Sequence, residues 1–150
     1  MSTTVTPADL AAAVAGAAGA VLETMFFAEL EPCPPVEEEE RLRMMAVRVG
    51  FDGGLRGEFR IGFAERLARA LTAAFLGTDE NDVTETEVDQ VIRETANMIC
   101  GAALSRIEAD EDMRLETPAL TGASAEEPGG FLHACFVTPD GSICTGVRIE

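Results

Sequence analysis

The stretch Glu94-Thr95-Ala96-Asn97 opens the run ETANMICGAALSRIE at residues 94–108, which is rich in helix-forming residues. At about 100° per residue, Glu94 and Asn97 project from the same side of a helix, about one turn apart. Three further residues fall on that side: Gln90, Gly101 and Ser105. The sequence therefore places a carboxylate, an amide and a glycine along one side of a helix.

The opposite side of this helix is apolar, and its stripe is complete without Glu94 or Asn97. Its members are Val88, Val91, Ile92, Thr95, Ile99, Ala102 and Ala103. The polar side therefore points away from the core. If this side served only to keep the helix soluble, a glycine would be a poor choice, because it lowers helix stability by about 1 kcal/mol relative to alanine. We interpret it as a docking and chemical surface; the alternative is an ordinary solvated helix face that happens to carry an amide.

The limits of the helix are also marked in the sequence. Thr84 and Glu87 have the spacing of a capping box, which predicts the first turn. The apolar period then continues without a break from Val88 to Ile107. This is the longest element that the sequence predicts, so the polar pair lies near the middle of a rigid platform.

The pattern Glu94-x-x-Asn97-x-x-x-Gly101 resembles the active-site helix of the CheC/CheX family of chemotaxis phosphatases. These proteins remove the phosphoryl group from the aspartyl phosphate of a CheY-like response regulator. The family pattern has Asp or Ser four residues before the Glu, where this chain has Gln90, and a proline after the Asn. Pro118 lies close to, but not at, the usual spacing of that proline.

The resemblance implies a role for each residue of the pattern. Asn97 would align the attacking water, because an amide offers both a hydrogen-bond donor and an acceptor without being protonated. Glu94 would bind the lysine of the receiver domain and fix the register of docking. Gln90 and Gly101 would contact the partner, with Gly101 allowing its loops to approach. Mg²⁺ would be bound by the receiver domain, and no metal or other cofactor is expected in this chain.

The resemblance further implies one site per chain and a homodimer, as in CheX-like members. The first predicted helix carries Glu23 with Phe26 three residues later, and a phenylalanine cannot orient a water. A second interpretation is a binding module on the same fold that holds a receiver domain or a switch protein without turnover. A third is a structural dimer without a signalling partner, which would tolerate changes at Glu94 and Asn97.

Composition indicates a single globular domain over residues 1–150, with 47% hydrophobic and 25% charged residues. The net charge is −16, from 27 acidic and 11 basic residues, and every basic residue is an arginine. The absence of lysine excludes mechanisms that need a lysine side chain. The negative charge argues against binding to nucleic acid or to an anionic membrane. The apolar run at residues 11–21 lacks a preceding positive charge, so we expect no signal peptide and a cytoplasmic protein.

The four cysteines and the single histidine show no metal-binding spacing. Cys100 lies beside the apolar side of the central helix and Cys135 lies in an apolar strand, so both are expected to be small buried hydrophobic residues. Cys33 and Cys144 belong to no motif. His133 is expected to have a structural role.

The first helix is predicted at about Pro7–Leu30, and it is followed by an acidic, mobile connection through Pro32 and residues 37–40. Its predicted buried side comprises Val14, Ala17, Val21, Leu22 and Met25. Helices followed by strands in each half predict an α+β fold, an antiparallel sheet with long helices against it. The resemblance to the CheC/CheX family implies that the two halves are pseudo-repeats, although the sequence shows no clear repeat residue by residue. The other predicted elements are strands at 44–51 and 55–63, a helix at 64–76, a strand near 113–120, a loop at 121–130, and strands at 131–138 and 142–149.

Overall fold

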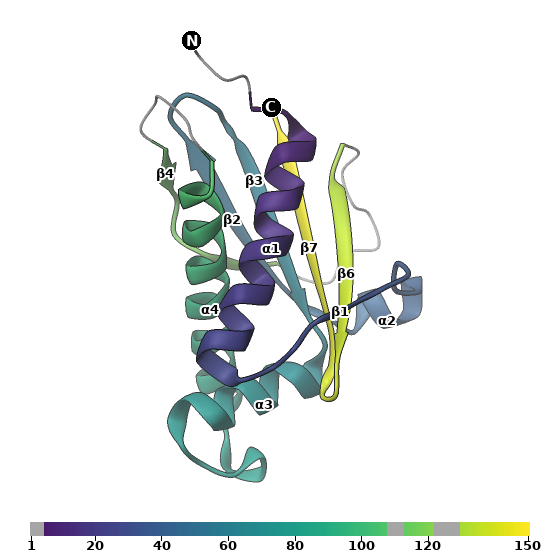
Figure 1. The fold of residues 1–150 in the computed structure, drawn as a ribbon. Helices are drawn as coiled ribbons and strands as arrows, with labels where there is room; N and C mark the ends of the chain where they lie inside the picture. The colour runs from purple at the N-terminus through teal and green to yellow at the C-terminus, as the bar shows by residue number, and fades with distance from the viewer. Residues whose placement is uncertain (1–4, 108–112, 122–129) are drawn as a thin grey trace.

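The computed structural model describes residues 5–107, 113–121 and 130–150. The fold is α+β, as the sequence predicted, with one antiparallel sheet in the order β1-β6-β7-β3-β2-β4 and with β5 also paired to β2. Figure 1 shows α1 and α4 side by side across one face of this sheet. The helices are α1 (Pro7–Phe26), α2 (Glu38–Leu42), α3 (Glu65–Leu76) and α4 (Glu85–Ser105), with a 3-10 turn η1 (Glu80–Asp82). The strands are β1 (Glu31–Cys33), β2 (Met45–Asp52), β3 (Gly57–Phe63), β4 (Arg114–Leu115), β5 (Ala119–Thr121), β6 (Leu132–Thr138) and β7 (Gly141–Ile149).

The core lies between the sheet and the helices, because alternate residues of the central strands are apolar. Phe51 and Phe59 pack with ring centroids 4.9 Å apart at its centre. The other fully buried apolar strand residues on this face are Val47, Val49, Ile61, Phe63, Ile143 and Val147. The predicted hairpin of β2 and β3 and the predicted hairpin of β6 and β7 are both present.

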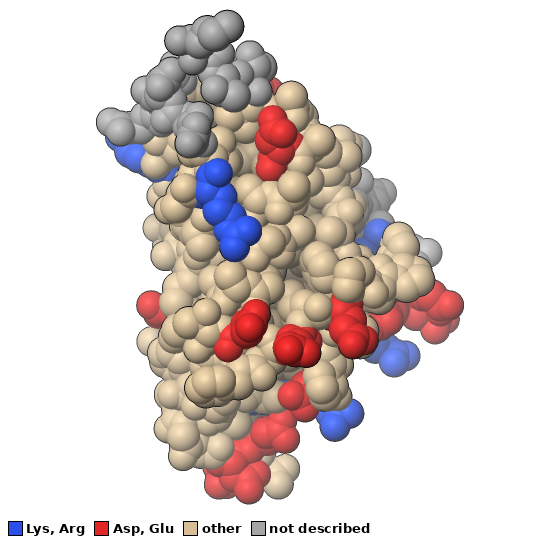
Figure 2. Space-filling model, viewed as in Figure 1, with Lys and Arg blue, Asp and Glu red and all other residues tan. Residues whose placement is uncertain are grey.

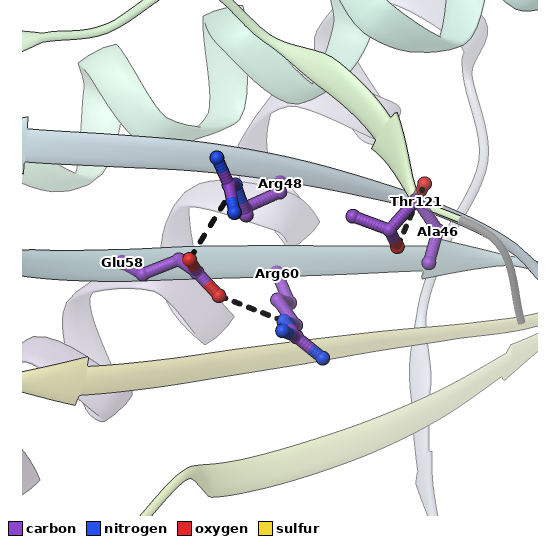
Figure 3. A network of polar contacts seen from close by, with 5 residues as sticks. All are labelled: Ala46, Arg48, Glu58, Arg60 and Thr121. Carbon is purple, nitrogen blue, oxygen red and sulfur yellow. Dashed lines mark hydrogen bonds and ion pairs between the residues drawn. The ribbon is translucent and has the colours of Figure 1, made fainter. Parts of the chain in front are cut away.

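The opposite face of the sheet is polar along β2 and β3. In Figure 3 the carboxylate of Glu58 lies between two arginines of the same face. The Nε of Arg60 donates to it at 2.8 Å, and the Nε of Arg48 lies 3.5 Å from it. At the sheet's edge, the hydroxyl of Thr121 donates to the carbonyl of Ala46 at 3.5 Å. The Glu58 side chain is only 13% exposed and the Arg60 side chain 21% exposed, while that of Arg48 is 51% exposed, so the two arginines neutralise a carboxylate that is largely shielded from solvent.

Helix α1 is long and apolar enough to cross a membrane by length and composition, with a mean hydropathy of 1.4. In this structure it is a core helix, because Leu10, Val14 and Leu22 are fully buried against α4 and the sheet. The helix ends at Phe26 rather than at Leu30, since the next residue adopts the left-handed conformation. The prediction that Met25 is buried was wrong: it is 46% exposed.

The acidic connection after α1 is more ordered than the sequence predicted. Residues 31–33 form β1, which pairs with β6, and residues 38–42 form α2. The hydroxyl of Ser142 donates to the carboxylate of Glu40 at 3.0 Å and ties α2 to β7. The partner strand of β1 lies about a hundred residues later, so local sequence patterns carry no sign of it.

The strand predicted near 113–120 is broken into β4 and β5, with Pro118 between them. The break is expected, because proline cannot donate to a strand ladder. Most of the loop predicted at 121–130 lies outside the described residues. Helix α3 ends at Gly77 as predicted, in the left-handed conformation with φ 69°.

Candidate functional site

Glu94 and Asn97 are both exposed on the outer side of α4, and Gln90 is exposed one turn before them. Gly101 is half-buried on the same side. The side chains of Glu94 and Asn97 make no hydrogen bond or ion pair with any other residue that the structure describes. The polar side predicted from the sequence therefore faces solvent, with its carboxylate and amide available to a partner.

The rotation of α4 about its axis is fixed by the residues between this pair. Thr95 and Ala96 are fully buried, and the Thr95 hydroxyl donates to the carbonyl of Val91 at 2.8 Å. At the start of the helix both hydrogen bonds of the predicted capping box are present, between Thr84 and Glu87. The helix ends at Ser105, two residues before the predicted limit. The polar pair is thus held on a rigid element.

A hollow of about 140 Å³ lies beside the N-terminal half of α4. Its walls include Gln90 and Glu94 from α4 and two apolar residues from the end of α3, Phe75 and Leu76. These apolar side chains are 48% and 39% exposed. An apolar patch next to exposed polar groups is typical of a docking surface.

Phe75 and Leu76 were not among the residues that the sequence singled out. The sequence did contain a sign of them, because both are large apolar residues that lie outside the buried stripe of α3. That stripe comprises Leu67, Ala68, Leu71, Thr72 and Ala73. Only the packing of α3 beside α4 shows that they adjoin the polar pair.

Among the residues that the structure describes, none packs closely against the glycine of the motif. A Cβ at Gly101 would meet only the Leu115 Cδ1, at 3.9 Å, which is an ordinary contact. Gly16 on α1 is different, because the guanidinium of Arg106 lies directly where its Cβ would be. At Gly16 the space left by the missing side chain is therefore filled by Arg106, whereas the corresponding space at Gly101 remains accessible.

The first helix carries no comparable pair. Glu23 is exposed and Phe26 is half-buried at the end of α1. A phenyl ring therefore stands in α1 at the position where the motif of α4 has its amide.

The helical face of the molecule is strongly acidic toward the N-terminal half of α4. Figure 2 shows acidic side chains gathered over the lower part of this face and few basic groups among them. This distribution matches the net charge of −16. No cluster of three or more metal-ligating side chains occurs among the described residues.

The remaining candidates lie away from α4. His133 is exposed on β6, and its ring stacks on Phe131 with centroids 5.8 Å apart. Cys100 is fully buried as predicted, and burial raises the pKa of its thiol far above the ordinary value. Cys135 is half-buried instead of buried, because it lies on the sheet face away from the helices, where its sulfur contacts Cys144.

The family model described as chemotaxis phosphatase CheX matches residues 45–127, which is more than half of the chain. The matched segment runs from β2 through α3 and α4 to β5, so it contains the whole polar side of α4. Among curated proteins, none matches this chain.

Solved structures share the fold over nearly the whole chain. Chemotaxis protein CheX from Vibrio vulnificus is 24% identical, with a TM-score of 0.77, and the alignment covers 98% of this chain and 100% of that one. A CheC-like superfamily protein from Shewanella sp. PV-4 is 25% identical, with a TM-score of 0.74, covering 95% and 97%. The CheX protein in the CheX–CheY–BeF3–Mg²⁺ complex from Borrelia burgdorferi is 20% identical, with a TM-score of 0.72, covering 93% and 96%.

Proposed function

Because this chain belongs to the CheX family of chemotaxis phosphatases, we propose that it hydrolyses the aspartyl phosphate of a CheY-like response regulator. The observation that carries the proposal is the outward projection of Glu94 and Asn97 from one side of a rigid helix. The Borrelia burgdorferi structure pairs a protein of this fold with CheY, which supports a receiver domain as the partner.

The reaction needs little from this chain beyond positioning. A water oxygen attacks phosphorus in line, the bond from phosphorus to the aspartyl oxygen breaks, and inorganic phosphate and a free carboxylate result. Asn97 would hold that water by donating from its NH₂ group or accepting at its carbonyl oxygen. Positioning of a reactant can lower a barrier by several kcal/mol, on the order of 7–11 in the best cases. Asn97 acts as neither nucleophile nor metal ligand, and Mg²⁺ belongs to the receiver domain.

Glu94 and its neighbours would provide docking. The carboxylate of Glu94 would bind the receiver's lysine, and the exposed position of this group leaves it free to do so. Gln90, where family members carry Asp or Ser, would donate or accept a hydrogen bond but adds no charge. Gly101 leaves room for a partner loop, since among the described residues only Leu115 comes within 4 Å of the position where its Cβ would be.

We also propose that the protein is a cytoplasmic homodimer, as the resemblance to CheX-like members suggests. The edges of the described sheet are formed by β1 on one side and by β4 and β5 on the other. Leu120 of β5 is 39% exposed, so an apolar side chain is available at that edge. Light scattering would give twice the chain mass of 15.9 kDa for a dimer and the chain mass itself for a monomer.

The direct test measures the decay of a phosphorylated CheY-like receiver with and without this protein, and with Asn97→Ala. We expect faster decay with the wild-type chain and about a hundredfold loss of that acceleration in the variant. Asn81→Ala is the matched control, because it removes an exposed amide away from α4 and should leave the decay unchanged.

The same measurement separates phosphatase from silent binder. Binding of the receiver with an unchanged phosphoryl half-life would contradict the catalytic proposal and favour the binding module. Gln90 would then be the first position to change, by Gln90→Asp, to test whether the family's usual acid restores turnover.

A further inference from the structure

Three of the four cysteines form a single row across three neighbouring strands. Cys33 of β1 lies directly opposite Cys135 of β6, and Cys135 lies directly opposite Cys144 of β7. Residues directly opposite one another in an antiparallel sheet project from the same face. The sequence separates the first cysteine from the other two by about a hundred residues, and only the sheet brings the three together.

The row projects from the face of the sheet opposite α1 and α4. The neighbours of Cys144 along β7, Ile143 and Thr145, point into the core, so the Cys144 side chain points the other way. Its sulfur lies in direct contact with the sulfur of Cys135. The row is therefore remote from the polar side of α4.

Cys135 is the only member that can pair with either of the others. Directly opposed residues on adjacent strands have Cα atoms about 4.5–5.5 Å apart, which is within the range that a disulfide spans. Cys33 and Cys144 are separated by a whole strand, about 10 Å, which is beyond that range. The row therefore allows two alternative disulfides that share Cys135.

The surroundings of the row differ from those of the remaining cysteine. Cys33, Cys135 and Cys144 are half-buried, while Cys100 is fully buried in the core. Burial raises the pKa of the Cys33 and Cys144 thiols, and the nearby cysteines and Glu40 raise it further. The first attack by either thiol is therefore slow at neutral pH. A site of this kind responds to sustained exposure to an oxidant rather than to a brief one.

We propose that this row is a thiol-oxidation site, in which a small-molecule disulfide such as oxidised glutathione converts Cys135 and Cys144 into an intrachain disulfide. Cys33 is the third thiol, which exchanges with this disulfide to give the Cys33–Cys135 bridge. The second bridge fastens the edge strand β1, and with it the segment between α1 and α2, to the neighbouring strand β6.

The reaction balances through two exchange steps. A protein thiolate attacks one sulfur of the small-molecule disulfide, its S–S bond breaks, and one small thiolate leaves with the electron pair and takes up a proton. The neighbouring protein thiolate attacks the mixed disulfide and releases the second small thiol. Two protein thiols are oxidised, and one disulfide molecule is reduced to two thiols.

The test incubates the full chain with oxidised glutathione, counts free thiols after denaturation, and maps tryptic peptides without reduction. Four thiols should fall to two. Cleavage after arginine leaves Cys135 and Cys144 in one peptide, residues 115–148, and Cys33 in another, residues 1–41. The first bridge is then a loss of two hydrogen atoms within one peptide, and the second is a link between two peptides.

Three serine variants and one control sharpen the test. Cys144→Ser should convert all of the product to the Cys33–Cys135 link, and Cys33→Ser should leave only the bridge within residues 115–148. Cys135→Ser should form no intrachain bridge, because the two cysteines that remain in the row are too far apart. Cys100→Ala, the control, should lose two thiols, from three to one, and form the same bridges as the wild-type chain.

Circular dichroism of each variant checks that it is folded, and unfolded variants are replaced by the corresponding alanine changes. Retention of four free thiols in the folded wild-type chain would overturn the proposal. A bridge that includes Cys100, a bridge between two chains, or a bridge that persists in Cys135→Ser would overturn it as well. None of these outcomes bears on the phosphatase, whose readout is the receiver's phosphoryl half-life.

Discussion

The side chains of Glu94 and Asn97 project from the same exposed side of α4, while the two residues between them are fully buried. Different residues of the helix therefore serve stability and partner recognition, because stability depends on the buried side and recognition on the exposed side. Substitutions of Glu94 and Asn97 should therefore alter docking or turnover with little effect on the free energy of unfolding, within about 0.5 kcal/mol.

Glu94→Gln should weaken docking of the receiver more than it slows the bound reaction. A hydrogen bond to a charged group contributes about 1.5–3 kcal/mol, so the receiver concentration for half-maximal rate should rise about tenfold or more. Receiver titrations of the dephosphorylation rate measure this. Glu23→Gln is the matched control, since it removes the same exposed charge from α1. Equal effects of the two changes would assign the loss to net charge and not to Glu94.

Gly101→Ala should stabilise the protein and weaken docking. Alanine gains up to about 1 kcal/mol over glycine in a helix interior, and the added Cβ meets only Leu115 at 3.9 Å. Urea unfolding and receiver titration measure the two effects. Gly19→Ala on α1 is the matched control, because its Cβ also meets a single leucine carbon, at 4.0 Å. The control should gain stability without losing docking; weakened docking by both variants would contradict a specific role for Gly101.

Thr84→Ala should destabilise the protein by about 1 kcal/mol, because it removes the side-chain acceptor that caps the Glu87 N–H. For a domain of this size that corresponds to about 2–4 °C in the melting temperature. Thermal unfolding followed by circular dichroism measures it. Thr86→Ala changes an exposed threonine two residues after the cap position and should shift the melting temperature by less. A fall of the same size in both variants would show that the cap is not the cause.

Raising the salt concentration should modestly strengthen binding of an acidic receiver domain. Acidic side chains dominate the face around the N-terminal half of α4, and screening weakens their repulsion of a like-charged partner. Association rates measured over a salt series would reveal the sign. A marked weakening would point instead to attraction by Arg93 or Arg106, both exposed on α4 or at its end. Arg93→Gln and Arg106→Gln would then identify which arginine is responsible.

Stability should fall as the pH rises above about 9. Burial raises the pKa of the Cys100 thiol from its ordinary value of 9.0, so the folded chain keeps this proton while the unfolded chain releases it. Unfolding then releases a proton, and each further pH unit costs at most about 1.4 kcal/mol for this group. The chain has no lysine and no tyrosine, so the other side chains that titrate there are the remaining cysteines, of which Cys33 and Cys144 also have a raised pKa. Urea unfolding at a series of pH values should show a shallower decline for Cys100→Ala, and an unchanged slope would contradict this assignment.

Much of the central helix could be predicted because its signals are local. The capping box is formed by neighbours in sequence, and the apolar period of α4 reports directly which side is buried. The same kind of signal placed α3 and the two hairpins correctly. Predictions failed where a segment depends on a distant partner, as in β1, or where a side chain's burial depends on the element that packs over it, as at Met25 and Cys135.

The sequence by itself determined that Glu94 and Asn97 share the exposed side of a long helix, because a helix has a fixed angle per residue and a visible apolar stripe. It also determined the acidic charge and the absence of lysine. Only the tertiary structure decided that Phe75 adjoins this side and that Cys33, Cys135 and Cys144 stand in one row. Both depend on how elements far apart in the chain pack and pair, which is set by burial of the whole core and by no local pattern.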